Sequence, residues 1–113
     1  MIETKKDCQK YLSKLRDTVT FDQRWRLHDY DSIPEHLLVN MINYAQNGEV
    51  LGSFLLAVFS NNLFQAYAKG DDYNQKIIPI YVKFIYNEMP FGCHGSEENV
   101  INWMKYKQEK NDE

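Results

Sequence analysis

The chain has 113 residues, of which 43% are apolar and 26% charged, proportions typical of one folded domain. Aromatic residues account for 14%, which excludes intrinsic disorder for most of the chain. The formal net charge of −3 argues against generic DNA binding. Residues 54–59 form the longest apolar run, far shorter than the ~20 residues of a membrane helix. Residues 1–7 lack the apolar stretch of a signal peptide, so we expect a cytoplasmic protein without membrane contact.

Charge is divided unevenly along the chain. Residues 1–26 contain seven basic and four acidic side chains, whereas residues 27–104 contain three basic and nine acidic ones. The net charges are therefore +3 and −6, and residues 105–113 are neutral. A basic amino-terminal arm on an acidic body favours intramolecular docking or association between copies. An ordinary solvated helix face is the alternative interpretation of the arm.

The first helix is expected over residues 4–17, with Thr4 and Asp7 at its amino-terminal end. Apolar residues recur along one narrow seam of it, and Lys6, Lys10 and Lys14 recur every four residues on another face. Residues 18–32 show no clear period, and the first four of them are compatible with extended structure. We interpret this stretch as an ordered connector anchored by its aromatic residues Phe21, Trp25 and Tyr30.

Two helices are expected in the middle of the chain. Ser32 with Pro34 and Glu35 predicts a capped helix start, and residues 47–48, Asn-Gly, predict its end. The next helix is expected over residues 52–68. It is apolar nearly all round, so we expect it to be the central, most buried helix.

The last two predicted helices flank a turn-rich loop at residues 89–95. One extends from Asp71 or Asp72 to about Asn87, where Asn87 is a candidate cap, and Pro79 predicts a kink or a division into two parts. Ser96 is expected to cap the final helix.

Together these elements predict an all-α fold, a compact bundle of about five short helices with a basic N-terminal helical arm. We expect residues 1–31 to form the basic helix and connector. Residues 32–106 are expected to form the helical core, and residues 107–113 a frayed tail.

Cys93 and His94 are the residues most suggestive of catalysis or metal binding. Adjacent ligands between two glycines do not provide the spacing of a metal site, and neither of the other histidines lies near them in sequence. A thiolate would be stabilised before the helix start at Ser96, but a turn between helices also requires small residues. We therefore expect no metal, no cofactor and no enzymatic activity.

Arg24, Trp25 and Arg26 form the strongest candidate binding motif. An aromatic plane between two guanidinium groups can stack on a base and bind a phosphate. The basic residues Lys6, Lys10, Lys14 and Arg16 could extend this motif into a basic concave surface, especially across an oligomer interface. The alternative is structural: Trp25 anchors the connector, and the arginines pair with Asp17, Asp22 or Asp29. Asn62, on the apolar stripe of the third helix, is a further candidate ligand contact or else a helix–helix hydrogen bond.

Several short motifs between Ile33 and Trp103 resemble a group of small bacteriophage and prophage proteins. These motifs are Ile33-Pro34-Glu35-His36-Leu37, Gly52-Ser53-Phe54-Leu55, Ala57-Val58-Phe59-Ser60-Asn61-Asn62-Leu63, Asp71 with Asn74, Ile85-Tyr86-Asn87, and Cys93-His94-Gly95-Ser96. The group usually has Asn-Asp-Leu at positions 61–63 and Cys-Trp-Gly-Ser at positions 93–96, so this chain departs at Asn62 and His94. The resemblance implies a phage-type origin and a helical body, and no particular chemistry.

Small early phage proteins often act by binding. We therefore expect an anti-defence protein that sequesters a nucleotide immune signal in the host cytoplasm, as a homo-oligomer with its site at Arg24, Trp25, Arg26, Lys14 and Asn62. The alternative is a protein–protein inhibitor or adaptor that meets a host protein through its acidic surface. A small hydrolase using Cys93 and His94 is the weakest of the three hypotheses.

Overall fold

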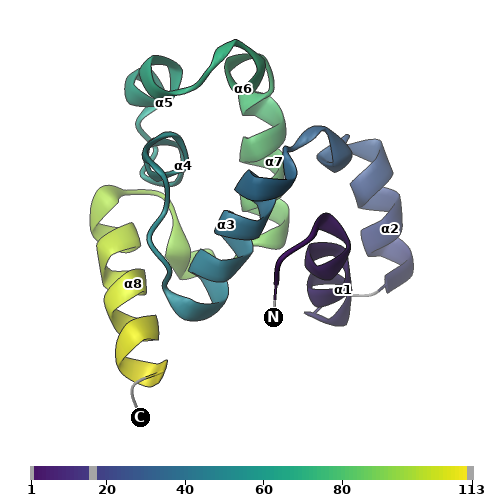
Figure 1. The fold of residues 1–113 in the computed structure, drawn as a ribbon, viewed down its shortest axis with the longest axis horizontal. Helices are drawn as coiled ribbons and strands as arrows, with labels where there is room; N and C mark the ends of the chain where they lie inside the picture. Colours follow the sequence, from purple (N-terminus) through teal and green to yellow (C-terminus); the bar gives the residue numbers. More distant parts are fainter. Residues whose placement is uncertain (1, 16–17, 112–113) are drawn as a thin grey trace.

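The computed structural model describes residues 2–15 and 18–111, and these residues form helices and loops without strands (Figure 1). The α-helices are α1 (Lys5–Leu15), α2 (Thr18–Leu27), α3 (Glu35–Asn47), α4 (Ser53–Phe59), α5 (Leu63–Lys69), α6 (Asp72–Lys76), α7 (Ile78–Glu88) and α8 (Glu97–Asn111). Two short 3-10 helices, η1 (Tyr30–Ser32) and η2 (Phe91–Cys93), lie between them. The all-α prediction is confirmed, but eight helices in this part of the chain make the expected number of about five too low.

Helix α3 is the centre of the fold. It lies between α8 on one side and α1 on the other (Figure 1). The side chains of Leu38, Met41, Ile42 and Tyr44 on α3 are completely buried. Tyr44 also packs edge-on against Phe59 of α4, with ring centroids 5.2 Å apart. The apolar face of α3 therefore organises the core, a role that we had assigned to the next helix.

The helix predicted over residues 52–68 is divided into α4 and α5. Asn61 adopts the left-handed conformation, with φ of 62°, which ends α4. Asn62 then caps α5, because its Oδ1 accepts a hydrogen bond from the backbone N–H of Gln65 at 3.2 Å. The chain turns here, so α5 lies at the surface, with Phe64 85% exposed. Only α4 is buried as expected.

Residues 18–32 form a helix and a 3-10 turn rather than a connector. Phe21 and Trp25 are one helical turn apart and are both buried, as is Tyr30 in η1. These three residues anchor the segment as expected. The i, i+4 spacing of Phe21 and Trp25 was itself the helical signal, which the polar residues between them concealed.

The remaining helix starts are partly as predicted. Thr4 and Asp7 form a reciprocal cap, with each backbone N–H donating to the other side chain at 3.1 Å. Ser96 Oγ accepts from the N–H of Asn99 at 3.1 Å. Ser32, by contrast, lies in η1 and does not cap α3, which has Pro34 at its N-cap and no side-chain cap. The predicted end of the first helix, at residues 16–17, lies outside the described residues.

The segment at residues 71–88 has two parts, as Pro79 predicted. Asp71 Oδ1 accepts from the N–H of Asn74 at the start of α6, and Pro79 occupies the first turn of α7. Asn87 lies inside α7 and does not cap it. Its amide instead donates to the hydroxyl of Tyr30 at 3.3 Å.

Helix α8 is longer than expected and continues to Asn111. Trp103 Nε1 donates to the carbonyl of Ala45 at 3.2 Å, and Gln108 Nε2 donates to the carbonyl of Gly48 at 3.0 Å. These contacts with the end of α3 stabilise residues that we expected to fray from 107 onward, while residues 112–113 lie outside the described residues. None of the described helices combines the length and apolarity needed to cross a bilayer.

Substitution of Gly48 should test the contact between α3 and α8. Gly48 has φ of 73°, and a Cβ there would lie 2.8 Å from the carbonyl oxygen of Met104. We expect Gly48→Ala to lower the free energy of unfolding by at least about 2 kcal/mol, since backbone strain and a steric clash add. The measurement is urea unfolding.

Gly92→Ala is the matched control. A Cβ at Gly92 would lie 3.8 Å from the ring of Trp103, an ordinary contact, and its φ is not in the left-handed region. Its stability should stay within about 0.5 kcal/mol of the parent protein. Equal stability of both variants would contradict the importance of this contact.

Candidate functional site: a groove between α1 and α2

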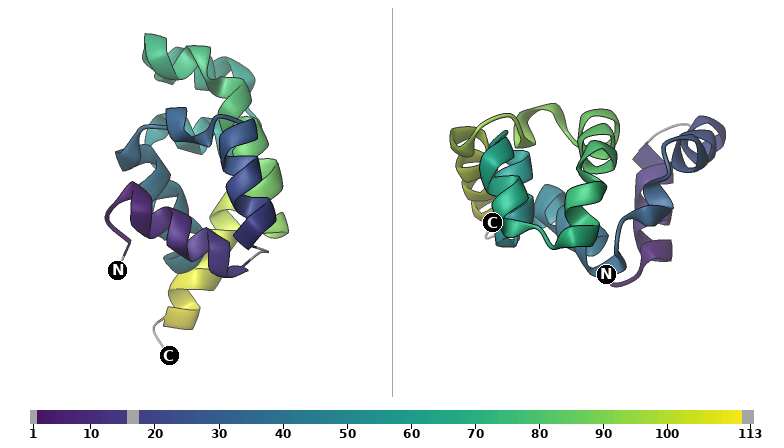
Figure 2. Two further views of the ribbon diagram at one scale, coloured as in Figure 1. Left: turned by 90° about the vertical axis from the view of Figure 1, so that its right-hand side faces the viewer. Right: turned by 90° about the horizontal axis from the view of Figure 1, so that it is seen from above.

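A groove of about 450 Å³ lies in the angle between α1 and α2. The two helices diverge from the connection between them (Figure 2, left). The lining residues are Lys6, Gln9, Lys10 and Ser13 from α1, and Asp22, Trp25 and Arg26 from α2. We call this cavity the α1–α2 groove.

Helical periodicity explains why these residues share the groove. On α1, residues 6, 9, 10 and 13 follow the i, i+3, i+4, i+7 spacing of one face. Cys8 and Leu12 lie on a different face and are buried in the core. The apolar seam therefore docks α1 on the body of the protein and leaves its polar face as one wall of the groove.

The groove is positively charged. Lys6, Lys10 and Arg26 contribute three cations, and no hydrogen bond or ion pair of their side chains occurs among the described residues. Asp22 is the one acid among the lining residues. Such cations on two walls of one cavity favour an anionic ligand, because no protein carboxylate among the described residues neutralises their charge.

Trp25 forms part of the groove but is not open to stacking. It is only 7% exposed, and its ring packs against Phe21 and edge-on against Tyr30, with centroids 5.8 Å apart in both pairs. This arrangement favours the structural interpretation of Trp25. The side chain supports α2 and presents only a small apolar area to a ligand.

Arg24 is occupied by a buried carboxylate. Its Nε and Nη2 donate to Glu88 of α7 at 2.8 and 3.0 Å, while the Tyr30 hydroxyl donates to the same carboxylate at 3.1 Å. Burial raises the pKa of Tyr30 to about 12, so this hydroxyl retains its proton. Together with Asn87, these residues form what we call the Glu88 cluster, and it fixes α2 against α7. Arg24 therefore has a structural partner in Glu88, as the structural interpretation of the arginines expects, but this partner is a glutamate of a distant helix.

Lys14 and Asn62 lie apart from this groove. Lys14 lines another recess, of about 240 Å³, which shares Lys10 with the groove and is also lined by Ile2, Asp7 and Tyr11. Asn62 is exposed at the start of α5 and caps that helix. Of the five predicted site residues, the α1–α2 groove thus brings together Trp25 and Arg26.

The sequence also contained a signal for the residues that were missed. Gln9 and Ser13 line the groove but are not among the predicted site residues, and Asp22 is expected from the sequence only as a possible partner of the arginines. Gln9 and Ser13 share the i, i+3, i+4, i+7 face with Lys6 and Lys10. Recognising α2 as a helix would have placed Asp22 one turn from Arg26 on the same face.

Cys93 does not have the environment of a nucleophile. It is completely buried, and this burial raises the pKa of its thiol to about 12. The imidazole of His94 is partly buried, which lowers the pKa of its ring. No group of metal-ligating side chains occurs in the described part of the chain.

A second, smaller cleft joins two of the loops whose motifs resemble the phage group. The N–H of Gly95 donates to the carbonyl of Phe59 at 2.8 Å, which holds the 59–62 turn beside the 93–95 loop. The cleft beneath them has a volume of about 140 Å³ and is lined mainly by apolar side chains. Asn61 and His94 are the polar side chains among its lining residues. No acidic or lysine or arginine side chain lines it, so it is a weaker candidate for an anion.

No protein-family model matches the chain, and neither the curated proteins nor the solved structures compared with it contain a match. The geometry described above is therefore the basis for any functional conclusion, and the resemblance to phage proteins stays a prediction.

Both thiols should resist modification in the folded state. The other cysteine, Cys8, is also fully buried, and the pKa of its thiol is raised to about 12, first by desolvation. Iodoacetamide requires a thiolate, so we expect alkylation of Cys8 and Cys93 only after denaturation. Mass spectrometry after treatment with and without urea measures the alkylation of each cysteine. Rapid alkylation of Cys93 in the native protein would contradict the conclusion that its thiol is buried and protonated.

Arg24 should contribute strongly to stability. Arg24→Met leaves the Glu88 carboxylate, whose side chain is fully buried, without its cationic partner. We expect the free energy of unfolding to fall by about 3 kcal/mol. Arg26→Met is the matched control on the same helix, because Arg26 is exposed, and it should change stability by less than about 0.5 kcal/mol. Similar losses in both variants would show that the Glu88 cluster is not what fixes α2.

Proposed function

We propose that the protein binds a nucleotide-type anion in the α1–α2 groove and acts by sequestering it. The observation that carries this proposal is a set of three cations, Lys6, Lys10 and Arg26, around one cavity of about 450 Å³, none of which pairs with a residue that the structure describes. Phosphate groups would take these cations as partners, since charge-assisted hydrogen bonds are the strongest polar contacts available there.

Sequestration requires binding rather than chemical conversion. The groove contains lysine, arginine, amide and hydroxyl groups together with one carboxylate. The resemblance to small phage proteins supports an anti-defence role, in which the captured ligand is a nucleotide signal of host immunity. Capture of that kind depends on a preorganised site, which the fixed position of α2 provides.

Association between copies would make the site more enclosed. The groove is open to solvent, and tight binding of a small ligand buries most of its surface. Phe64 of α5 and Tyr86 of α7 are 85% and 80% exposed, which is unusual for aromatic side chains and provides apolar area for association between copies, although neither residue lines the groove. We therefore propose a homo-oligomer as the functional form, and native mass spectrometry measures its size.

A protein–protein inhibitor is the second candidate. The exposed acids considered for it are Asp29, Asp31, Glu35, Asp71, Asp72, Glu97 and Glu98. They belong to η1 and its flanks, α3, the α6 region and α8, and some have internal roles, as when Asp71 caps α6. The exposed aromatic residues favour this candidate more than the acids do, because partner proteins commonly cover such side chains.

Charge reversal in the groove tests the nucleotide proposal. Titration with ADP should stabilise the protein by about 2.7 kcal/mol at 100 times the dissociation constant. The double variant Lys6→Glu/Arg26→Glu should weaken ADP binding at least tenfold for each residue, about 1.5–3 kcal/mol each, because repulsion replaces two phosphate contacts. Calorimetry measures the affinity.

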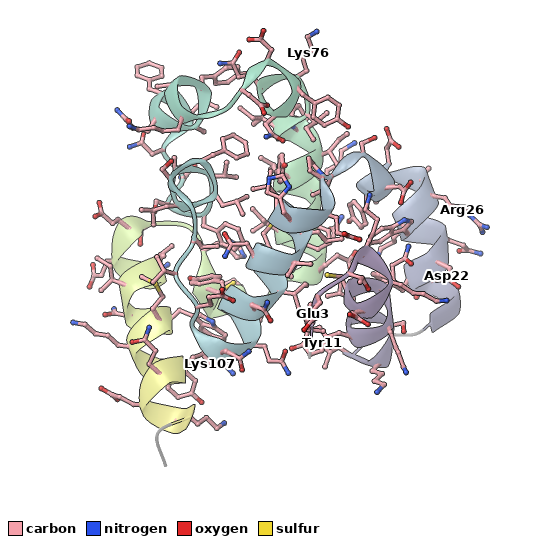
Figure 3. All side chains as sticks on the ribbon, viewed as in Figure 1. Glu3, Tyr11, Asp22, Arg26, Lys76 and Lys107 are labelled. Atoms are coloured by element: carbon pink, nitrogen blue, oxygen red, sulfur yellow. The ribbon has the colours of Figure 1, made fainter. Side chains whose placement is uncertain are left out.

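Lys76→Glu/Lys105→Glu is the matched control. It changes the net charge equally but affects exposed lysines of α6 and α8, and Lys76 lies far from Arg26 (Figure 3). Its affinity for ADP should remain within a few-fold of the parent protein. Equal weakening by both double variants, or no binding of any nucleotide by the parent protein, would overturn the proposed function in favour of the inhibitor.

A further inference from the structure

Asp22 is the unexpected member of the α1–α2 groove. Its carboxylate is exposed and forms no hydrogen bond or ion pair with any described residue, although Lys10 and Arg26 line the same cavity. A site that held only phosphate would bind more tightly without it, since the negative charge repels an anion. The Asp22 carboxylate can accept hydrogen bonds, so a groove that combines it with three cations is suited to a ligand that carries hydrogen-bond donors as well as negative charge.

The positions of these groups give the groove two different ends. Ser13 and Asp22 are the lining residues nearest in sequence to the α1–α2 connection, whereas Lys6 and Arg26 are the farthest from it. Because the two helices diverge (Figure 2, left), these sequence positions put the acceptor where the helices are closer together and two of the cations where they are farther apart.

The separation along α2 sets the scale of the ligand. Asp22 and Arg26 are four residues apart, about 6 Å along the helix axis, and lie on the same face. Figure 3 labels both side chains on this helix. This distance is comparable to that between the 5′-phosphate of a nucleotide and the hydroxyls of its ribose. Carboxylates accept hydrogen bonds from ribose hydroxyls in dinucleotide-binding proteins, so the chemistry is suitable.

We propose that Asp22 accepts hydrogen bonds from the ribose hydroxyls of a ribonucleotide whose phosphates lie against Lys6, Lys10 and Arg26. This inference rests on the proposed function and specifies the class of ligand. Asp22 selects ribonucleotides over deoxyribonucleotides and inorganic phosphates, and the cations supply affinity for the phosphates. No covalent step is involved.

The experiment compares three probes by calorimetry: ADP, 2′,3′-dideoxy-ADP and pyrophosphate. The parent protein should bind ADP about tenfold more tightly than the dideoxy form, because a hydrogen bond to a charged acceptor is lost. Asp22→Ala should reduce this ratio to near one. It should leave the affinity for the dideoxy form and for pyrophosphate unchanged or higher, since a repulsive charge has been removed.

Asp72→Asn is the control for the loss of one negative charge, because Asp72 is exposed on α6, away from the groove. It should keep the tenfold preference. Asp22→Asn provides a second variant of similar size at the site and should show a reduced ratio. Circular dichroism should show native helix content in every variant, as expected for exposed side chains.

The possible failures are distinguishable. Equal affinity of the parent protein for ADP and the dideoxy form, or a preference that survives in Asp22→Ala, would overturn the role of Asp22 and leave the groove as a phosphate site. Equal affinity for pyrophosphate and ADP would also overturn it. If none of the three probes binds, the proposed function itself is wrong.

Discussion

The buried carboxylate of Glu88 constrains how the amino-terminal part of the protein can fold. Its side chain has no exposed surface, so its charge must be satisfied within the protein. Arg24 supplies two hydrogen bonds from α2, and Tyr30 supplies a third from η1. The helix that carries Arg24 can therefore occupy only a narrow range of positions against α7. Aromatic contacts of Tyr30 with Trp25 and Phe84 strengthen the same junction.

This constraint determines the candidate site as well as the fold. Arg24 is held by the body of the protein and Trp25 is buried, while Asp22 and Arg26, one turn apart on α2, line the groove. The residues of the Arg24-Trp25-Arg26 motif, which suggested nucleotide binding, therefore have two different roles. Two of its residues support the helix, and one remains available for a ligand.

Much of the fold followed from local signals in the sequence. The cap at Thr4, the glycine stop at Gly48 and the division of the helix at Pro79 each depend on a few adjacent residues, and all three were predicted correctly. Periodicity also identified the apolar seam of α1, of which Cys8 and Leu12 are buried.

The errors arose where tertiary contacts or a single dihedral angle decided the outcome. Nothing in the 52–68 periodicity indicates that Asn61 adopts a positive φ, so the division into α4 and α5 was missed. The contacts that extend α8 come from Ala45 and Gly48, more than 50 residues away in sequence. The prediction of the site residues failed at Arg24 for the same reason. Its partner, Glu88, is 64 residues away in sequence, and no spacing rule connects the two.

The two helices that form the groove are bonded to different parts of the fold. Helix α1 is fastened to the region before α3 and to α3 itself: Lys5 Nζ donates to the carbonyl of Asp31 at 2.8 Å, and the N–H of Lys5 donates to Glu35 at 2.9 Å. Helix α2 is fastened to α7 through Glu88. A ligand that contacts both α1 and α2 would link α3, to which α1 is bonded, with α7, to which α2 is bonded. Its binding energy would then oppose the separate opening of either helix, and slower amide exchange would extend well beyond the residues in contact with it.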